Sequence, residues 1–242
     1  MPDARAPEAD DASFAPSLLD LVLGGLLALV FFFVPVAIYF LITGAVPLFG
    51  GKVTQVAVLC AVALEAVAIG CAIYVAVLWR RHIGWRGFGL RPIGRRWIVG
   101  SALTGLGCVP LLVLVVYAVQ SALGLPHVSP QAGAIAPEGA SWWGLLLMLP
   151  LGGVAVPIAE ELMFRGLLFR WLRRHLTFAP SAVLSAMIFG IVHGQLEVGI
   201  GAFVVGIVLA YAYERSGSLW PSIIIHAVQN SVSFTLMYFA LV

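Results

Sequence analysis

Long apolar runs recur along this chain, and each is long enough to cross a lipid bilayer as one helix. A helix needs about 20 apolar residues to span the hydrocarbon core. The 242 residues are 62% hydrophobic and 10% charged, with a mean hydropathy of +1.05, which is too apolar for a water-soluble globule. Because lipid forces the backbone to satisfy its own hydrogen bonds, we expect an all-α, polytopic transmembrane helix bundle.

Seven runs are predicted as spans, or eight if one of them is split. Two basic clusters orient them: residues 79–97 hold six arginines and residues 170–175 hold three, and such clusters stay on the cytoplasmic side. This places the N-terminus in the cytoplasm and, with seven spans, the C-terminus outside. The predicted spans are 18–42, 53–78, 98–119, 142–170, 180–194, 198–213 and 219–242.

Three parts are expected along the chain: a flexible cytoplasmic tail (1–16), N-terminal transmembrane helices with a basic loop (17–140), and a core of transmembrane helices (141–242).

The three cysteines lie in apolar runs, which argues against a disulfide framework. No basic groove interleaved with aromatic residues is present, so nucleic acid is not an expected partner, whereas the lipid bilayer is. One lysine stands against twelve arginines, and we expect a multi-pass protein of a bacterial plasma membrane.

Two adjacent carboxylates, Glu160 and Glu161, lie with Arg165 inside the fourth predicted span. A charged side chain at the centre of a spanning helix costs about 2.5–3.5 kcal/mol on insertion scales, so this group calls for an explanation. Glu161 and Arg165 are i and i+4 on one helix face, where they can pair. Glu160 points roughly 100° away. We interpret the pair as a structural support and Glu160 as a free carboxylate able to act as a base.

Polar residues also interrupt the fifth and seventh predicted spans. Phe189 and His193 share one helix face, and so do His226 and Asn230, because each pair is four residues apart. At about 1.5 Å per residue, Glu160 and both histidines can meet at one depth in the bilayer. The sequence therefore predicts one polar site shared by three spans.

These groups fit the hydrolysis of a peptide bond in two ways. In the first, Glu160 with His193 deprotonates a water, while His226 and Asn230 donate hydrogen bonds to the oxyanion. In the second, Glu160, His193 and His226 bind a zinc ion, which lowers the pKa of its bound water to about 7. Spacing alone does not choose between them.

Glu65 is a lone acidic residue in the second predicted span. It is either a functional carboxylate or a protonated or hydrogen-bonded side chain within the bundle, and no motif surrounds it to decide.

Three short motifs, in this order, resemble the signature of the CPBP family, which comprises the Abi or CAAX proteases and bacteriocin-processing enzymes and includes the type II CAAX prenyl endopeptidases. The motifs are Glu160-Glu161-x-x-x-Arg165, Phe189-x-x-x-His193 and His226-x-x-x-Asn230. Phe88-Gly89-Leu90-Arg91 also looks like a segment common ahead of the first motif. The resemblance covers residues 141–242, which would be the catalytic core.

The resemblance implies an intramembrane endopeptidase that cleaves a membrane-associated peptide or a prenylated, CAAX-like protein tail. Glu160 would be the water-activating base, His193 its partner, and His226 with Asn230 the oxyanion stabilisers. The family commonly carries the label metalloprotease, so zinc stays an open alternative.

Two other functions fit the same residues. A proton-coupled membrane transporter could use Glu65, Glu160 and the histidines as a relay. An inactive family member could instead serve as a membrane scaffold or a bacteriocin-immunity factor.

Overall fold

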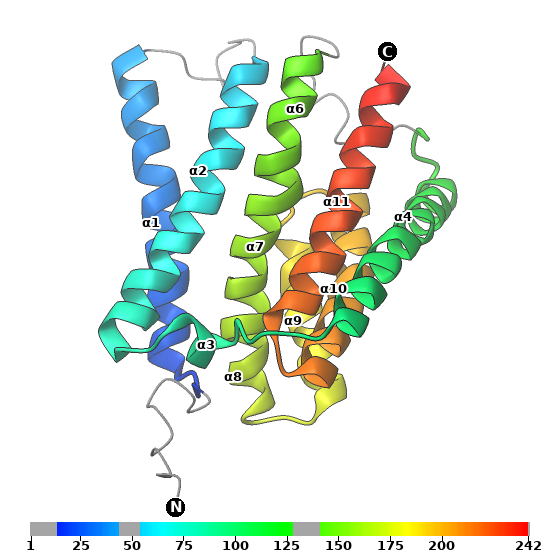
Figure 1. Cartoon of the computed structure of the whole chain (residues 1–242). Coiled ribbons are helices and arrows are strands. Elements are labelled where there is room, and N and C mark those ends of the chain that lie inside the picture. Colours follow the sequence, from blue (N-terminus) through cyan, green and yellow to red (C-terminus); the bar gives the residue numbers. More distant parts are fainter. Residues whose placement is uncertain (1–13, 44–53, 128–140, 242) are drawn as a thin grey trace, which may run out of the picture.

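The computed structural model describes residues 14–43, 54–127 and 141–241, and all regular secondary structure in these ranges is helical. The predicted all-α class is therefore confirmed. The helices are α1 (Leu18–Thr43), α2 (Gln55–Ile73), the π-helix η3 (Tyr74–Trp79), α3 (Trp85–Phe88), α4 (Arg95–Leu123), α6 (Trp142–Pro150), the π-helix η4 (Leu151–Ala155), α7 (Val156–Glu161), the π-helix η5 (Leu162–Phe169), α8 (Arg170–Arg173), α9 (Phe178–Ile191), α10 (Leu196–Ser216) and α11 (Leu219–Leu241) (Figure 1).

Six helical stretches in the described ranges are long and apolar enough to cross a membrane, and the protein is a multi-pass membrane protein. The stretch from α6 to α8 forms one of the six. The predicted fifth span, 180–194, is the exception. It corresponds to α9, which has 14 residues and so is about 21 Å long, against a hydrocarbon core of about 30 Å. The α1 helix begins at the lower end of Figure 1 and α11 ends at the upper end.

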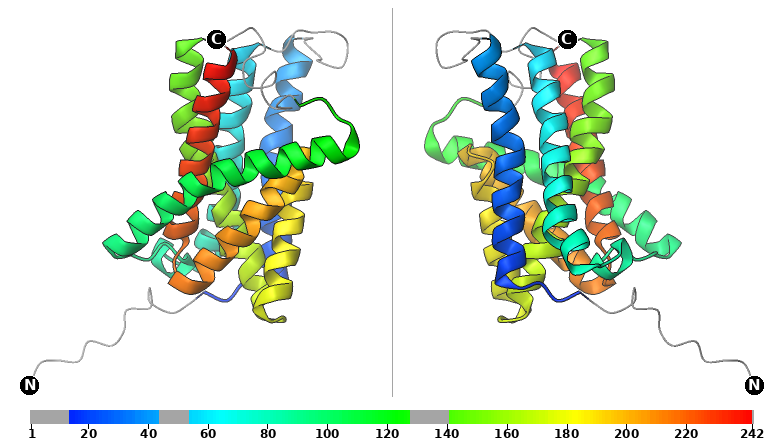
Figure 2. Two further views of the ribbon diagram at one scale, coloured as in Figure 1. Left: turned by 90° about the vertical axis from the view of Figure 1, so that its right-hand side faces the viewer. Right: turned by 90° about the vertical axis from the view of Figure 1, so that its left-hand side faces the viewer.

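The short α9 pairs with α10, and two glycines allow their close approach. A Cβ on Gly190 would lie 2.5 Å from the Gly199 carbonyl oxygen, and one on Gly199 would lie 2.7 Å from the Gly190 carbonyl oxygen. Small residues of this kind let two helix backbones approach closely within a membrane. Figure 2 shows this hairpin in the lower part of the bundle, with α4 crossing it obliquely.

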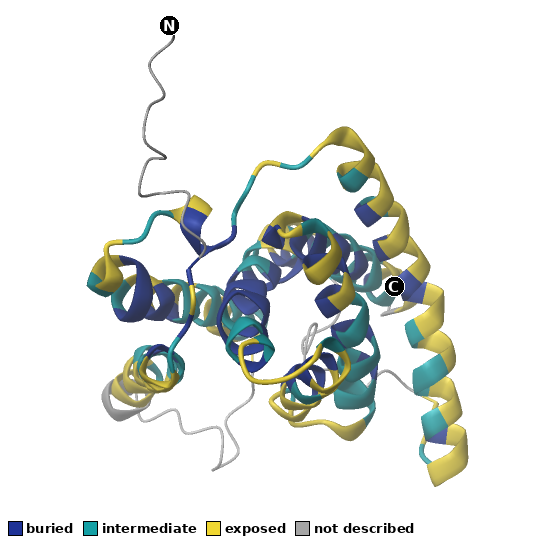
Figure 3. Ribbon diagram, turned by 90° about the horizontal axis from the view of Figure 1, so that it is seen from below, coloured by how far each residue is buried: buried dark blue, intermediate teal, exposed yellow. Residues whose placement is uncertain are grey.

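Apolar side chains cover the outside of the bundle. Figure 3 shows exposed residues on the outward faces of the helices and buried residues towards the centre. In α1, for example, Leu26, Leu29 and Phe33 are all more than half exposed. This distribution is expected where the surrounding medium is lipid rather than water.

The loop segment that begins at Phe88 is fixed to the lower end of the bundle. Phe88 is fully buried, and its carbonyl accepts a hydrogen bond from Arg170 Nη1 at 2.5 Å. The Leu219 amide donates to the Gly89 carbonyl at 2.9 Å. A Cβ on Gly166 would lie 2.5 Å from the Phe88 ring, so the ring needs the glycine beneath it. This segment therefore joins the starts of α8 and α11.

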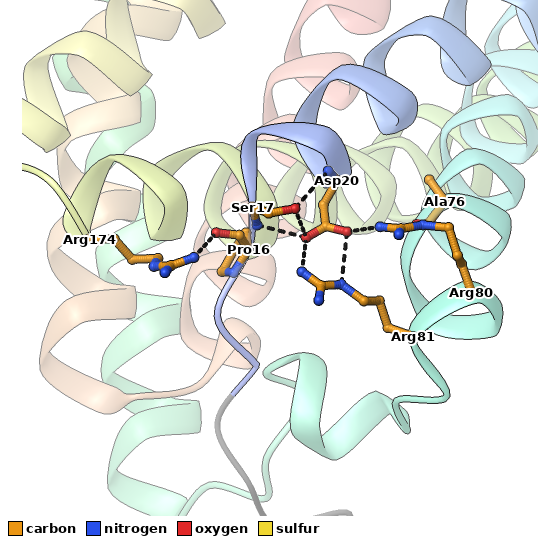
Figure 4. A network of polar contacts seen from close by, with 7 residues as sticks. All are labelled: Pro16, Ser17, Asp20, Ala76, Arg80, Arg81 and Arg174. Carbon is orange, nitrogen blue, oxygen red and sulfur yellow. Dashed lines mark hydrogen bonds and ion pairs between the residues drawn. The ribbon is translucent and has the colours of Figure 1, made fainter.

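Asp20, at the start of α1, binds two arginines of the basic loop (Figure 4). Its carboxylate accepts hydrogen bonds from Arg80, from Arg81 Nη2 at 2.5 Å and from the Ser17 amide at 2.7 Å. The Ser17 hydroxyl in turn accepts from the Asp20 amide, which makes a capping box. The hydrogen bond to Asp20 raises the pKa of Arg81 and keeps it charged.

Phe14 and Pro16 lie in the part that the sequence assigned to a flexible tail, yet both are buried. The Phe14 ring stacks on Phe88 with centroids 5.6 Å apart. Arg174 Nη1 donates to the Pro16 carbonyl at 2.5 Å (Figure 4). The predicted tail therefore ends before Phe14, and the rest of it lies outside the described residues.

Candidate active site

A proline shapes the helix that carries the glutamate pair. Pro157 has no amide hydrogen, so carbonyls in the preceding turn lack a helical donor. Asn230 Nδ2 donates to the Gly152 carbonyl at 3.3 Å, and Ser231 Oγ donates to the Gly153 carbonyl at 3.4 Å. A Cβ on Gly153 would lie 2.5 Å from Ser231 Oγ. The hydrogen bonds to the Gly152 and Gly153 carbonyls thus hold α11 against the helix that carries the glutamates. The lack of a side chain at Gly153 leaves room for this close contact.

Arg165 and Glu161 form the predicted i,i+4 ion pair, and both side chains are fully buried. Arg165 Nη1 donates to Glu161 Oε1 at 2.7 Å, and Nη2 donates to the Gly206 carbonyl of α10 at 3.1 Å. The guanidinium carbon lies 4.6 Å from the centroid of the Phe189 ring on α9. A Cβ on Gly206 would lie 2.8 Å from Ala186 Cβ, so this glycine lets α10 reach the arginine. Arg165 therefore ties three helices together.

His226 of α11 lies between the two glutamates. Its Nδ1 is 3.1 Å from Glu161 Oε1, and its Nε2 is 3.6 Å from Glu160 Oε2. A carboxylate only accepts hydrogen bonds, so Nδ1 carries the hydrogen in the shorter contact. Glu161 thereby orients the ring, and Nε2 is the nitrogen that faces Glu160.

His193 is held by its own helix turn rather than by a glutamate. Its Nδ1 lies 2.6 Å from the Phe189 carbonyl oxygen, which leaves Nε2 as the free ring nitrogen. The Phe189 ring is almost fully buried and packs edge-on against His193 at 4.9 Å and against His226 at 5.7 Å between centroids. The sequence paired His193 with Glu160, but among the described contacts Glu160 pairs with His226.

A cavity of about 640 Å³ brings the predicted residues together. Glu160, His193, His226 and Asn230 all line it. Glu161 and Arg165 do not line the cavity. Their buried ion pair contacts its wall through His226, which Glu161 orients. A buried carboxylate, two imidazoles and an amide around one cavity can move a proton and bind a developing oxyanion.

A known family matches the part of the chain that carries Glu160, His193, His226 and Asn230. Residues 142–232 match the type II CAAX prenyl endopeptidase Rce1-like family. This part of the chain is therefore similar to the Rce1-like family. A curated relative, "Putative membrane peptidase YdiL" of Bacillus subtilis (strain 168), is 32% identical over 85 residues. The aligned residues make up 35% of this chain and 35% of that relative, so the chain spans about a third of the relative's length. No solved structure matches.

Some residues that line the cavity lie outside residues 142–232, the part that matches the Rce1-like family. Glu65 of α2, which the sequence left undecided, lines the same wall as Glu160. Gln195 and Glu197, at the start of α10, also face the cavity, and sequence reasoning missed both. They follow His193 by two and four residues, and this nearness is the one signal in the sequence that could have identified them.

The zinc alternative needs three donors that converge. In the ranges that the structure describes, no group of three His, Cys, Asp or Glu side chains is placed to hold a metal ion. The donor set Glu160, His193 and His226 therefore does not fit zinc in this arrangement.

Proposed function

We propose that this chain is an intramembrane endopeptidase that hydrolyses a peptide bond inside the cavity described above. The observation that carries the proposal is the buried chain of contacts from Arg165 through Glu161 and His226 to Glu160, which ends at the cavity wall. The Rce1-like match and the name of the Bacillus relative, a membrane peptidase, support the same reaction class.

In this proposal Glu160 is the base that takes a proton from the attacking water. His226 Nε2 faces Glu160, and a protonated His226 would donate to the oxyanion as it forms. The Asn230 amide, held at the Gly152 carbonyl, would be a second donor. His193 lines the same cavity and presents Nε2 as a partner for the water.

The substrate that we propose is a membrane-associated peptide or a prenylated, CAAX-like protein tail. Much of the cavity wall is apolar, and Val58, Val62, Leu112 and Val116 are among the residues that line it. An apolar wall lowers the free energy of a buried lipid chain or an apolar peptide side chain. The Rce1-like match favours the prenylated tail.

A matched pair of peptides tests the proposal. The purified protein in liposomes would be given one CAAX-type peptide with and without a farnesyl group, and the products would be identified by mass spectrometry. We expect hydrolysis at one defined bond, faster for the farnesylated peptide. Cleavage of neither peptide by folded protein would contradict the proposal.

One observation also favours a proton-coupled transporter, because Glu65, Glu160 and both histidines line one cavity in the manner of a proton relay. Substrate flux that needs Glu65, without any peptide hydrolysis, would support transport instead. A scaffold or immunity role would survive a Glu160→Gln, His193→Ala double variant.

A further inference from the structure

Glu65 is a half-buried carboxylate on the cavity wall, and the hydrolysis proposed for Glu160 does not use it. It lines the same cavity as Glu160, and in the described part of the chain it has no hydrogen-bond or ion-pair partner. A carboxylate inside a spanning helix is unfavourable, and no hydrogen bond or ion pair in the described part of the chain offsets this for Glu65. Its placement therefore needs a functional explanation.

Glu65 and Glu160 lie at matching depths on neighbouring helices. Glu65 is 14 residues from Trp79, at the end of its span, and Glu160 is 13 residues from Arg173, at the end of its own. At 1.5 Å per residue, each lies about 20 Å from the lower end of the bundle. The α2 and α7 helices pack against each other, and the two carboxyl groups are near enough to interact electrostatically.

Charge balance in this cavity can come from His226, which faces Glu160, but not from a lysine or an arginine of the described wall. None of the lining residues in the described ranges is a lysine or an arginine. Arg165 lies behind the wall and is bound to Glu161 and the Gly206 carbonyl. A protonated His226 would balance Glu160 alone, so the two carboxylates in this apolar site are not both ionised and one of them keeps a proton.

We propose that Glu65 is a second acid–base residue of the cavity, which holds a proton in the resting protein and gives it to the amine that leaves. In this proposal Glu160 is the ionised member of the two, because His226 Nε2 faces it at 3.6 Å. This inference rests on the proposed function, since it assigns the second proton transfer of the same hydrolysis.

Glu160 and Glu65 each transfer one proton in this reaction. Glu160 takes a proton from water as the water oxygen bonds to the carbonyl carbon, and the carbonyl electrons move onto oxygen. The tetrahedral intermediate re-forms the carbonyl, the C–N bond breaks, and the nitrogen takes the proton of Glu65. The proton on Glu160 then passes to Glu65 through water, which restores both groups, and the net change is the addition of one water across the bond.

A comparison of leaving groups tests this role. The probes are a peptide that the wild type cleaves and a p-nitrophenyl ester with the same acyl part, because nitrophenolate leaves without a proton. We expect Glu65→Gln to lower peptide hydrolysis by about 10²- to 10⁴-fold, the usual contribution of an acid–base group, and to change ester hydrolysis only a few-fold. Glu160→Gln should lower both, since both need the activated water.

Glu197→Gln is the matched control, because it removes another carboxylate from the same cavity wall. It should leave the ratio of peptide to ester hydrolysis at the wild-type value. An unchanged ratio in Glu65→Gln, whether both rates fall or neither does, would overturn the inference. A wild type that cleaves neither probe would instead contradict the proposed function.

A second measurement does not need the Glu65→Gln variant to fold. Dicyclohexylcarbodiimide reacts with protonated carboxyl groups in apolar surroundings, and peptide mass spectrometry of the labelled wild type locates the product. We expect the label on Glu65. Its absence from Glu65 would overturn the proposed resting proton.

Discussion

His226 Nδ1 lies 3.1 Å from Glu161 Oε1, so the glutamate that pairs with Arg165 also orients the histidine that faces Glu160. Glu161 Oε1 thus takes part both in the ion pair with Arg165 and in the contact that orients His226. The other oxygen, Glu161 Oε2, has no partner among the described residues. Removal of the Arg165 side chain should therefore alter the position of His226, because Glu161 contacts both residues.

Arg165→Ala should destabilise the protein strongly and abolish cleavage. It would leave Glu161 fully buried without its cation, and breaking a buried ion pair typically costs about 3–5 kcal/mol. Thermal unfolding in detergent measures the loss, with cleavage assayed on the same preparation.

The control for this change is Arg173→Ala. Arg173 pairs with Glu214 at 2.8 Å, but both side chains are about a third exposed, and pairs of this kind contribute about 0–1 kcal/mol. Equal losses of stability in the two variants, or inactivation of Arg165→Ala at wild-type stability, would contradict the supporting role of Arg165.

Gly190→Ala should destabilise the α9–α10 hairpin and reduce activity. The added Cβ would lie 2.5 Å from the Gly199 carbonyl oxygen, which is backbone and cannot rotate away. Overpacking of this kind costs about 1–3 kcal/mol, and the forced separation would displace His193, three residues along the chain. Melting temperature and cleavage rate give the two readouts.

Gly107→Ala, within α4, is the matched helix glycine, because nothing lies within 4 Å of its added Cβ. It should keep or slightly raise stability, since alanine favours a helix by about 1 kcal/mol over glycine. If both alanine variants behaved alike, the close contact between Gly190 and Gly199 would not be needed.

Chelation should leave cleavage intact, because the donors Glu160, His193 and His226 do not converge in the described arrangement. The Nδ1 atoms of both histidines are also already engaged, by the Phe189 carbonyl and by Glu161. Elemental analysis of the purified wild type beside a His193→Ala, His226→Ala variant provides the check. Near-stoichiometric zinc in the wild type alone, with activity lost on chelation, would establish a zinc site instead.

The sequence predicted the helices well because hydropathy alone defines a span. The first and seventh spans, predicted at 18–42 and 219–242, are α1 (Leu18–Thr43) and α11 (Leu219–Leu241). The Glu161–Arg165 pair was also predictable, since an i,i+4 contact needs only the helix period.

Hydropathy and the helix period could not predict contacts between different helices. The partner of Glu160 depends on how α11 packs at Gly153, and the sequence alone does not contain that distance. Glu65 could be placed in a span but not on a cavity wall. Asp20 was passed over because its arginine partners lie 60 and 61 residues away in the chain.

The central claim is that Glu160 is the base of a hydrolytic site, and Glu160→Gln tests it most directly. Glutamine keeps the size of the side chain but cannot accept the proton of water. In proteoliposomes, with the peptide that the wild type cleaves, we expect the rate to fall by about 10²- to 10⁴-fold while the melting temperature stays close to that of the wild type. Cleavage at the wild-type rate by folded Glu160→Gln protein would contradict the account.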